Sequence, residues 1–87
     1  MKYSAQFRKQ LKAAKKRGKQ LEKLEAVVDV LANDRPLPEK YRDHALTGSW
    51  SDHRECHIEP DWLLIYYKQD DVLVLSLVAT GSHSDLF

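Results

Sequence analysis

Apolar and polar positions at the start of the chain follow the 3.6-residue period of an α-helix. Ser4, a residue type that caps helix starts, precedes the first apolar series, and Gly18 separates it from the second. The pattern predicts amphipathic helices over residues 5–17 and 21–32, joined as a helical hairpin with the apolar stripe inside and the lysines outside. The Pro-Leu-Pro run at 36–38 stops the second helix because proline lacks the amide hydrogen.

From Arg54 the period changes to two, which predicts a β-strand. Cys56 and Ile58 are expected to face the core, and the polar residues between them to face the other side of the sheet. Cys56 is therefore expected to be buried and unreactive. These polar residues are Glu55, His57 and Glu59.

Two later segments, 62–67 and 72–79, are apolar almost throughout, as in strands covered on both faces. Residues 69–71 supply a turn between them, and Lys2-Tyr3 is expected to add a short edge strand. The predicted fold is α+β, with two N-terminal helices packed on a small, mostly antiparallel sheet, in one domain spanning residues 1–87.

Composition narrows the classes of protein to consider. Eighty-seven residues, 43% of them hydrophobic, form one small core without room for a deep cofactor cleft, so we expect no cofactor. A single cysteine excludes an internal disulfide framework and a multi-thiolate metal site, and fits a reducing compartment. No apolar run approaches the roughly 20 residues that span a bilayer. We expect a cytoplasmic protein with no membrane partner.

Charge is distributed unevenly, although the net charge is only +1. Residues 1–20 hold eight of the 14 Lys and Arg residues and none of the 13 Asp and Glu residues. This asymmetry favours a polyanion or an acidic partner for one face, with Lys12, Lys15 and Lys16 as contact candidates. A solvated helix face that only confers solubility explains the same charges equally well.

Histidines are the main candidates for acid–base chemistry, because imidazole titrates near neutral pH. Pro60 ends the predicted strand and places Asp61 at its end, and Gly81 releases His83 near a sheet rim. His57, Asp61 and His83 can therefore converge, with His44 arriving from the preceding loop. His53 is more simply a surface residue.

Some aromatic and basic residues have two interpretations. Phe87 presents a ring on which a base can stack, whereas Trp50 and Trp62 either stack on bases or pack in the core. Arg54 either binds phosphate or pairs with an acidic side chain.

The residues alone leave three functional classes open. The first is metal-free acid–base cleavage of RNA. The second is a metallohydrolase that uses His44, His57, Asp61 and His83, although no compact ligand pair such as HExxH is present. The third is a non-catalytic module that binds RNA or a partner, which explains the basic helix and leaves the histidines unused. A chelator separates the first two classes, and a cleavage assay separates both from the third.

Three sequence blocks carry a resemblance to a known family. They are DHALTGSW at 43–50, RECHIEPDWLLIY at 54–66 and TGSHSDLF at 80–87. In this order and at these separations they resemble the YafQ family of bacterial toxins, within the RelE/ParE superfamily. The similarity extends over nearly the whole chain, including the lysine-rich helical pair and the Pro-Leu-Pro run.

This resemblance implies a ribosome-dependent mRNA endonuclease, or mRNA interferase, that is the toxin of a type II toxin–antitoxin pair. Such toxins cut messenger RNA in the ribosomal A site without a metal or cofactor, so the implied partners are a cognate antitoxin, the ribosome and mRNA. The implied fold is RelE-like and microbial-ribonuclease-like, in agreement with the predicted α+β fold.

The resemblance also implies roles for individual residues. The family's catalytic residues fall on His44, His57, Asp61 and His83. Its C-terminal aromatic falls on Phe87, and Trp62 helps to hold the message. We expect His83 to protonate the leaving 5′-oxygen, and Asp61, assisted by His44 or His57, to promote attack by the 2′-hydroxyl.

The chain departs from the family at one position. Relatives commonly place an arginine just before the Thr-Gly of the tail block, where this chain has Ala79. The missing guanidinium weakens charge stabilisation beside the scissile phosphate unless another basic group, such as Arg54, replaces it. We expect residue 79 to lie at an exposed strand end, from which an introduced arginine would reach the site.

Overall fold

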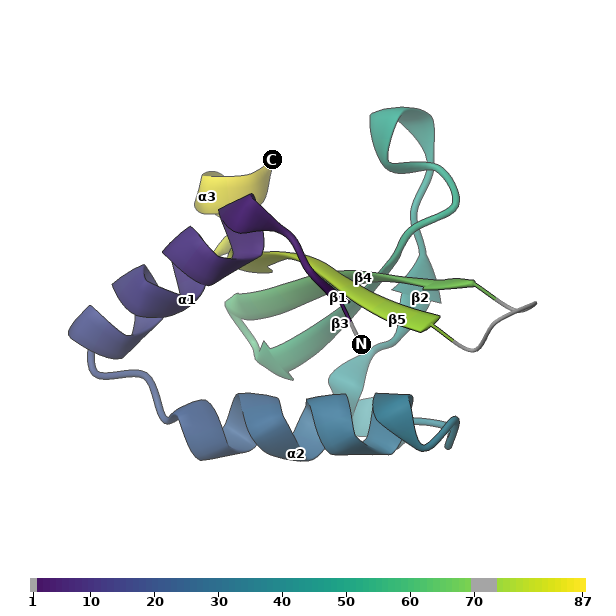
Figure 1. The fold of residues 1–87 in the computed structure, drawn as a ribbon, viewed down its shortest axis with the longest axis horizontal. Helices are drawn as coiled ribbons and strands as arrows, with labels where there is room; N and C mark the ends of the chain where they lie inside the picture. Colours follow the sequence, from purple (N-terminus) through teal and green to yellow (C-terminus); the bar gives the residue numbers. More distant parts are fainter. Residues whose placement is uncertain (1, 70–73) are drawn as a thin grey trace.

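The computed structural model describes residues 2–69 and 74–87, and its helices and strands are shown in Figure 1. In chain order these are β1 (Lys2–Tyr3), α1 (Ala5–Lys16), α2 (Leu21–Ala32), the 3-10 turn η1 (Glu39–Tyr41), β2 (His44–Ala45), the 3-10 turn η2 (Gly48–Trp50), β3 (Arg54–Glu59), β4 (Trp62–Gln69), β5 (Val74–Gly81) and α3 (His83–Leu86).

The strands form one sheet in the order β1-β5-β4-β3-β2. Only the β1–β5 pair is parallel among the described strands, so the predicted mostly antiparallel sheet and the edge strand at Lys2-Tyr3 are confirmed. The predicted turn at 69–71 falls largely on residues 70–73, outside the described part of the chain. The short elements β2, η1, η2 and α3 were not predicted, because none is long enough to show a period.

Helix α1 begins where its cap residue predicts. The Ser4 hydroxyl oxygen accepts a hydrogen bond from the Phe7 amide at 2.9 Å, and the hydroxyl donates to the Val78 carbonyl at 2.6 Å. The cap therefore also ties the start of α1 to β5. After α1, Gly18 has a φ of +79°, a left-handed conformation that glycine adopts without steric cost.

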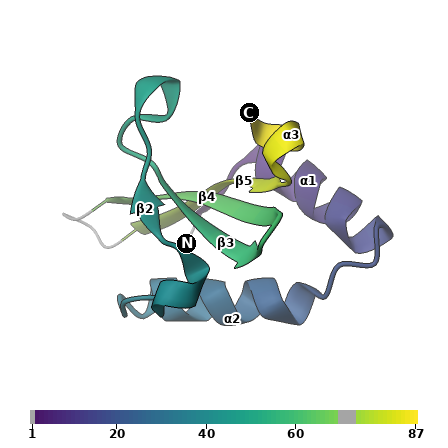
Figure 2. The same cartoon turned by 180° about the vertical axis from the view of Figure 1, so that it is seen from behind.

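The two long helices cover one face of the sheet, which we call the helix face. Figures 1 and 2 show α1 and α2 splayed apart, with α2 lying across the sheet. The predicted helical hairpin is therefore wrong: α1 packs on β5 and α2 on β3, so each apolar stripe is buried by the sheet. The core contains Phe7, Ala14, Leu24, Val27, Leu31, Cys56, Ile58, Trp62, Leu64, Tyr66, Leu75 and Leu77.

The opposite face, which we call the histidine face, is defined by strand register. Glu55, Ile65 and Ala79 are neighbours across β3, β4 and β5 and form one row. His57, Leu63 and Gly81 form the next row. Leu63, Ile65 and Ala79 are completely buried, so both faces of β4 are covered, as its continuous apolar run predicts. On this side of the sheet lie the 46–53 segment and α3 (Figures 1 and 2).

Among the described residues, no helix combines the length and the apolar character needed to cross a membrane.

Cys56 is buried on the helix face, and its burial raises the pKa of the thiol to about 12. We expect only about one thiol in 10⁴ to be ionised at pH 8, and the thiolate is the reactive form. Iodoacetamide should therefore leave Cys56 of the native protein unmodified and alkylate it completely in denaturant, as measured by mass spectrometry. A Ser84→Cys variant, which adds an exposed thiol, is the matched control and should react rapidly. Rapid alkylation of native Cys56 would contradict the burial of this residue.

Candidate functional site

The structure brings His44, His57 and His83 together on the histidine face. His44 lies on β2, His57 on β3 and His83 at the start of α3. The ring centroids are 6.3 Å apart for His44 and His57 and 5.9 Å apart for His57 and His83. Two consecutive strands and the C-terminal helix therefore place their imidazoles as successive neighbours, His44 beside His57 and His57 beside His83, as expected from the strand ends.

Asp61 joins this group at the turn between β3 and β4. Its Oδ1 accepts a hydrogen bond from the His83 amide at 3.2 Å and lies 3.8 Å from the ring Nδ1 of His83. The side chains of both residues are more than half exposed. A carboxylate and an imidazole are thus within reach of the same bound group, which is the requirement for paired proton transfer.

Sequence reasoning assigned no role to Glu55, which the structure places between two of the histidines. Its side chain is only 4% exposed, and its Oε1 lies 3.5 Å from the Nε2 of His44 and 3.3 Å from the Nε2 of His57. The β2–β3 register pairs His44 with Glu55 directly. The alternation of side chains along the strand already placed Glu55 on the same face as His57. It does not show that other segments cover this face and bury Glu55.

Aromatic rings continue the series of histidines. Phe87, which is 58% exposed, has its ring centroid 5.9 Å from that of His83 and 6.4 Å from that of Trp50. Trp50 lies 5.5 Å from His53, and His53 lies 5.6 Å from Tyr67. His53, set aside by the sequence analysis, is therefore part of this arrangement. We call the rings of Phe87, Trp50, His53 and Tyr67 the aromatic band; rings of this kind can stack on nucleic-acid bases.

Trp62 does not fit the substrate-binding role predicted for it. Its indole is on the helix face and 1% exposed, and its Nε1 donates a hydrogen bond to the Thr80 hydroxyl at 3.0 Å. The Thr80 hydroxyl in turn donates to the Leu63 carbonyl at 2.7 Å. The packing interpretation is correct, because a buried ring has no free face for a base.

Arg54 is also directed away from the histidines. The β3 register places it on the face opposite Glu55 and His57, and its guanidinium donates two hydrogen bonds to Asp43, at 3.3 and 3.2 Å. The Tyr66 hydroxyl donates to the same carboxylate. The Asp43 hydrogen bond raises the pKa of Arg54, while burial is the largest cause of the raised pKa of Tyr66. Pairing with an acidic side chain is therefore the role that the structure shows for Arg54.

Ala79 is buried, so the expectation of an exposed position at this strand end is wrong. It has 0% exposure and lies in one row with Glu55 and Ile65. The reason is that the histidine face is covered as well as the helix face. A long side chain introduced at residue 79 therefore requires its neighbours to move.

The tail that carries His83 is held by a network of hydrogen bonds. The Ser82 hydroxyl accepts from the Asp85 amide, and the Asp85 carboxylate accepts from the Ser82 amide at 3.0 Å, forming a capping box. Arg17, the residue after α1, donates to the same carboxylate at 3.1 Å. Gly81 lets α3 approach β5 closely, because a Cβ at this position would lie only 3.0 Å from that of Asp85 and the two would have to move apart. These contacts fix the position of His83 relative to the sheet.

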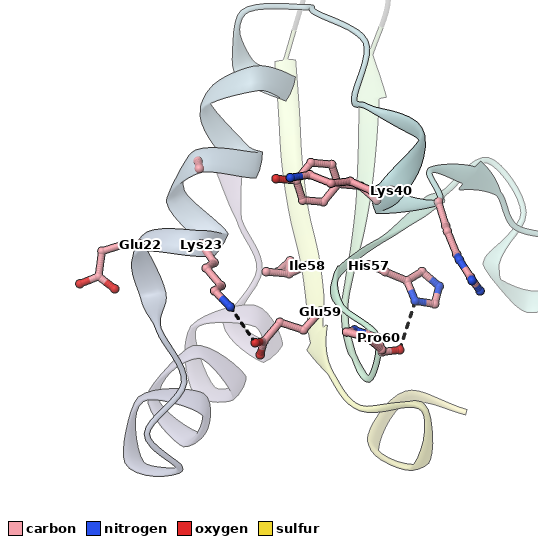
Figure 3. Close-up of a pocket in the computed structure, with 10 residues that line it drawn as sticks. Glu22, Lys23, Lys40, His57, Ile58, Glu59 and Pro60 are labelled. Carbon is pink, nitrogen blue, oxygen red and sulfur yellow. Dashed lines mark hydrogen bonds and ion pairs between the residues drawn. The ribbon is translucent and has the colours of Figure 1, made fainter.

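A pocket of about 570 Å³ lies beside His57, between α2, η1 and the end of β3. Figure 3 shows the His57 ring next to Pro60, and Lys23 paired with Glu59 on the α2 side. Lys40 and Tyr41 of η1 complete the wall. The pocket gives an extended ligand space next to one of the central histidines.

The lysines of α1 that the sequence analysis selected are exposed. Lys12, Lys15 and Lys16 form no ion pair with the described residues, whereas Lys19 and Lys23 both pair with Glu59. Within residues 2–69 and 74–87, no group of three or more His, Cys, Asp and Glu side chains is arranged to hold a metal ion.

Comparison with known proteins identifies the family. The family model described as a bacterial toxin of a type II toxin–antitoxin system, YafQ, matches residues 1–87. The mRNA interferase toxin YafQ of Escherichia coli K12 is 45% identical over 98% of this chain and 91% of its own length. Two solved structures are similarly close.

The first structure is the E. coli DinJ–YafQ complex, with a TM-score of 0.91, 45% identity and coverage of 99% of this chain and 94% of that one. The second is a metal-bound toxin from Helicobacter pylori, with a TM-score of 0.92, 46% identity and coverage of 99% and 96%. These similarities confirm the predicted fold and the family resemblance.

The tail network makes a prediction about pH. The Ser82 amide and then Arg17 hold the pKa of Asp85 below its ordinary value of 3.8. Their stabilisation of the tail is therefore present above pH 4 and is lost as pH falls through the lowered pKa. The amide resonance of Ser82 should report this loss in an NMR titration, and Asp85→Asn should abolish the change. Asp52→Asn, a substitution at another exposed aspartate, should leave the titration as it is in the parent. A Ser82 resonance that does not move below pH 4 would argue against the network.

Proposed function

Because the chain belongs to the YafQ family of type II toxin–antitoxin toxins, we propose that it is an mRNA interferase that cuts mRNA in the ribosomal A site. The observation that carries this proposal is the series formed by His44, His57 and His83. Asp61 and Phe87 lie directly beside it. The family and the geometry favour an endoribonuclease over a module that only binds RNA, which would leave these groups unused.

The proposed reaction is a transfer of the phosphate from the 5′-oxygen to the neighbouring 2′-oxygen. Asp61 accepts the proton of the 2′-hydroxyl, and the oxygen attacks the phosphorus. His83 donates its proton to the 5′-oxygen as that bond breaks, so no alkoxide has to leave. The products are a 2′,3′-cyclic phosphate and a 5′-hydroxyl end. The 3.8 Å separation of Asp61 and His83 allows both residues to act on one nucleotide.

The aromatic band and the basic helix provide binding in this proposal. Phe87 and Trp50 stack on bases next to the scissile bond, since base–aromatic stacking tolerates any sequence. The exposed lysines of α1 contact ribosomal RNA. An antitoxin, which the E. coli YafQ relative has in DinJ, covers the basic face or the histidines with an acidic segment. The protein acts in the cytoplasm, where its substrate is translated.

Replacing His83 tests the chemical step. His83→Ala should slow single-turnover cleavage of mRNA on programmed ribosomes by about 10²-fold or more, because the leaving oxygen loses its acid. Ser84→Ala, the matched control on the same exposed face of α3, should cleave at the parent rate. Cleavage is read as 5′ ends mapped by primer extension. An unimpaired His83→Ala variant would exclude the proposed acid.

A chelator tests the alternative that the protein is a metal-dependent hydrolase. The similarity to a metal-bound toxin from Helicobacter pylori is the reason to test it. EDTA added at a fixed free magnesium concentration that supports the ribosome should leave the cleavage rate unchanged. Loss of activity that zinc or copper restores would replace the metal-free mechanism with a metal-dependent one.

Charge reversal tests the basic helix. Changing Lys12, Lys15 and Lys16 together to Glu should weaken ribosome association and flatten its salt dependence by about one in slope for each lost phosphate contact. The same three positions changed to Arg keep the charge and form the matched control, with the parent slope. Association is measured by co-sedimentation over a salt series. If the triple Glu variant and the triple Arg variant show the same dependence of ribosome association on salt, these lysines do not contact ribosomal RNA and only make the exposed face of α1 soluble.

A further inference from the structure

We propose that Glu55 is a positioning residue that holds His44 and His57 as two imidazolium cations facing the substrate phosphate. This proposal rests on the proposed ribonuclease function and assigns roles to the two histidines that do not act as the acid. Three observations carry it: the burial of Glu55, the identity of the groups around its carboxylate, and the groups at the far side of each ring.

Burial makes the carboxylate of Glu55 dependent on its neighbours. Glu55 is 3% exposed, and a carboxylate taken out of water is strongly destabilised unless cations or hydrogen-bond donors face it. The ring nitrogens of His44 and His57 lie 3.5 and 3.3 Å from its Oε1. No lysine or arginine forms an ion pair with Glu55 among residues 2–69 and 74–87. The histidines are therefore the groups that can compensate this charge.

The far nitrogen of each ring decides how many protons the ring carries. The Nδ1 of His44 lies 2.7 Å from the Arg42 carbonyl, and the Nδ1 of His57 lies 3.3 Å from the Pro60 carbonyl. A carbonyl oxygen only accepts, so each Nδ1 must carry a proton to make its contact. Each Nε2 then faces a carboxylate oxygen, which also accepts. A ring with protons on both nitrogens directs an N–H toward each of these acceptors, and such a ring is a cation.

The surrounding titratable groups leave this arrangement intact. The groups that face or lie near the two rings, apart from Glu55 and each other, are His83 of α3, Lys23 of α2, Glu59 of β3, and Lys40, Tyr41 and Arg42 of the segment before β2. Lys23 and Glu59 pair with each other, and Lys40 lies over the Tyr41 ring, 5.1 Å from its centroid. His83, protonated as the acid of the proposed reaction, adds a positive charge 5.9 Å from the His57 ring, and the carboxylates of Glu55 and Asp61 oppose this repulsion.

Two imidazolium cations against one carboxylate leave a net positive charge beside His83. A developing phosphorane carries additional negative charge, which preformed cations stabilise more than they stabilise the ground state. The pair therefore supplies the positive charge that family members are expected to take from an arginine at the position of Ala79. Glu55 and Ala79 belong to the same row across the sheet. The imidazolium pair held by Glu55 and an arginine at position 79 would therefore place positive charge on the same part of the histidine face.

Nitrogen-15 NMR of the isolated protein tests the protonation directly. In parent protein labelled at its histidine rings, at pH 7 with EDTA present, His44 and His57 should each show two protonated ring nitrogens. In Glu55→Gln, which keeps the size of the side chain and removes its charge, each ring should lose a proton. Glu59→Gln, at the end of the same strand but turned toward α2, where it pairs with Lys23, should leave the two spectra as in the parent. A neutral His44 or His57 ring in the parent overturns the proposal.

Kinetics provide the second measurement. Glu55→Gln should move the alkaline limb of the single-turnover pH–rate profile to lower pH, because the two rings lose the facing carboxylate charge. Glu55→Asp should restore part of this shift, and Glu59→Gln should show none. A Glu55→Gln protein that folds and cleaves with the parent profile overturns the proposal. If the parent chain cleaves no RNA, the proposed function fails, while the NMR result still decides whether Glu55 holds two cations.

Discussion

The register of the three central strands is the constraint on which the rest of the structure depends. Side chains alternate between faces, so a slip of one residue between β3 and β4 would move His57 into the core and Cys56 to the histidine side. The apolar core under α1 and α2 opposes such a slip, because a shift of one residue cannot keep Cys56, Leu64 and Tyr66 buried together. The packing of the helix face therefore determines the chemistry presented on the opposite face.

Much of this arrangement could be predicted from the sequence, because it follows from periodicity. The sequence predicted the two helices, the strand at 54–59 and the sides of the sheet to which Cys56 and His57 point. It also predicted the convergence of three histidines with Asp61. The missed features share one cause. The burial of Glu55 and Ala79 depends on short segments, 46–53 and 83–86, whose positions are set by tertiary contacts rather than by any local pattern.

The same limit explains the errors over Trp62 and Arg54. Both residue types serve substrate binding and packing equally well in sequence, and only the strand face distinguishes the two uses. Trp62 lies on the helix face with its nitrogen bonded to Thr80, and Arg54 is neutralised by Asp43. The family resemblance located Trp62 next to Asp61 correctly, but Asp61 lies in the turn beside His83, whereas Trp62 begins β4 with its side chain in the core.

The order of the chain has a consequence for how the protein is made. β1 at residues 2–3 pairs with residues 76–77 of β5, and Gln10 of α1 accepts a hydrogen bond from the Thr80 amide. β1 and α1 therefore have their partners in the sheet only after β5, which lies between β1 and β4, has been synthesised. A product of interrupted translation that lacks residues 74–87 has neither His83 nor β5, the strand that pairs with β4 beside Leu63 and Ile65. For a protein proposed to cut messages, the groups of the proposed site therefore come together only once β5 and α3 are in place.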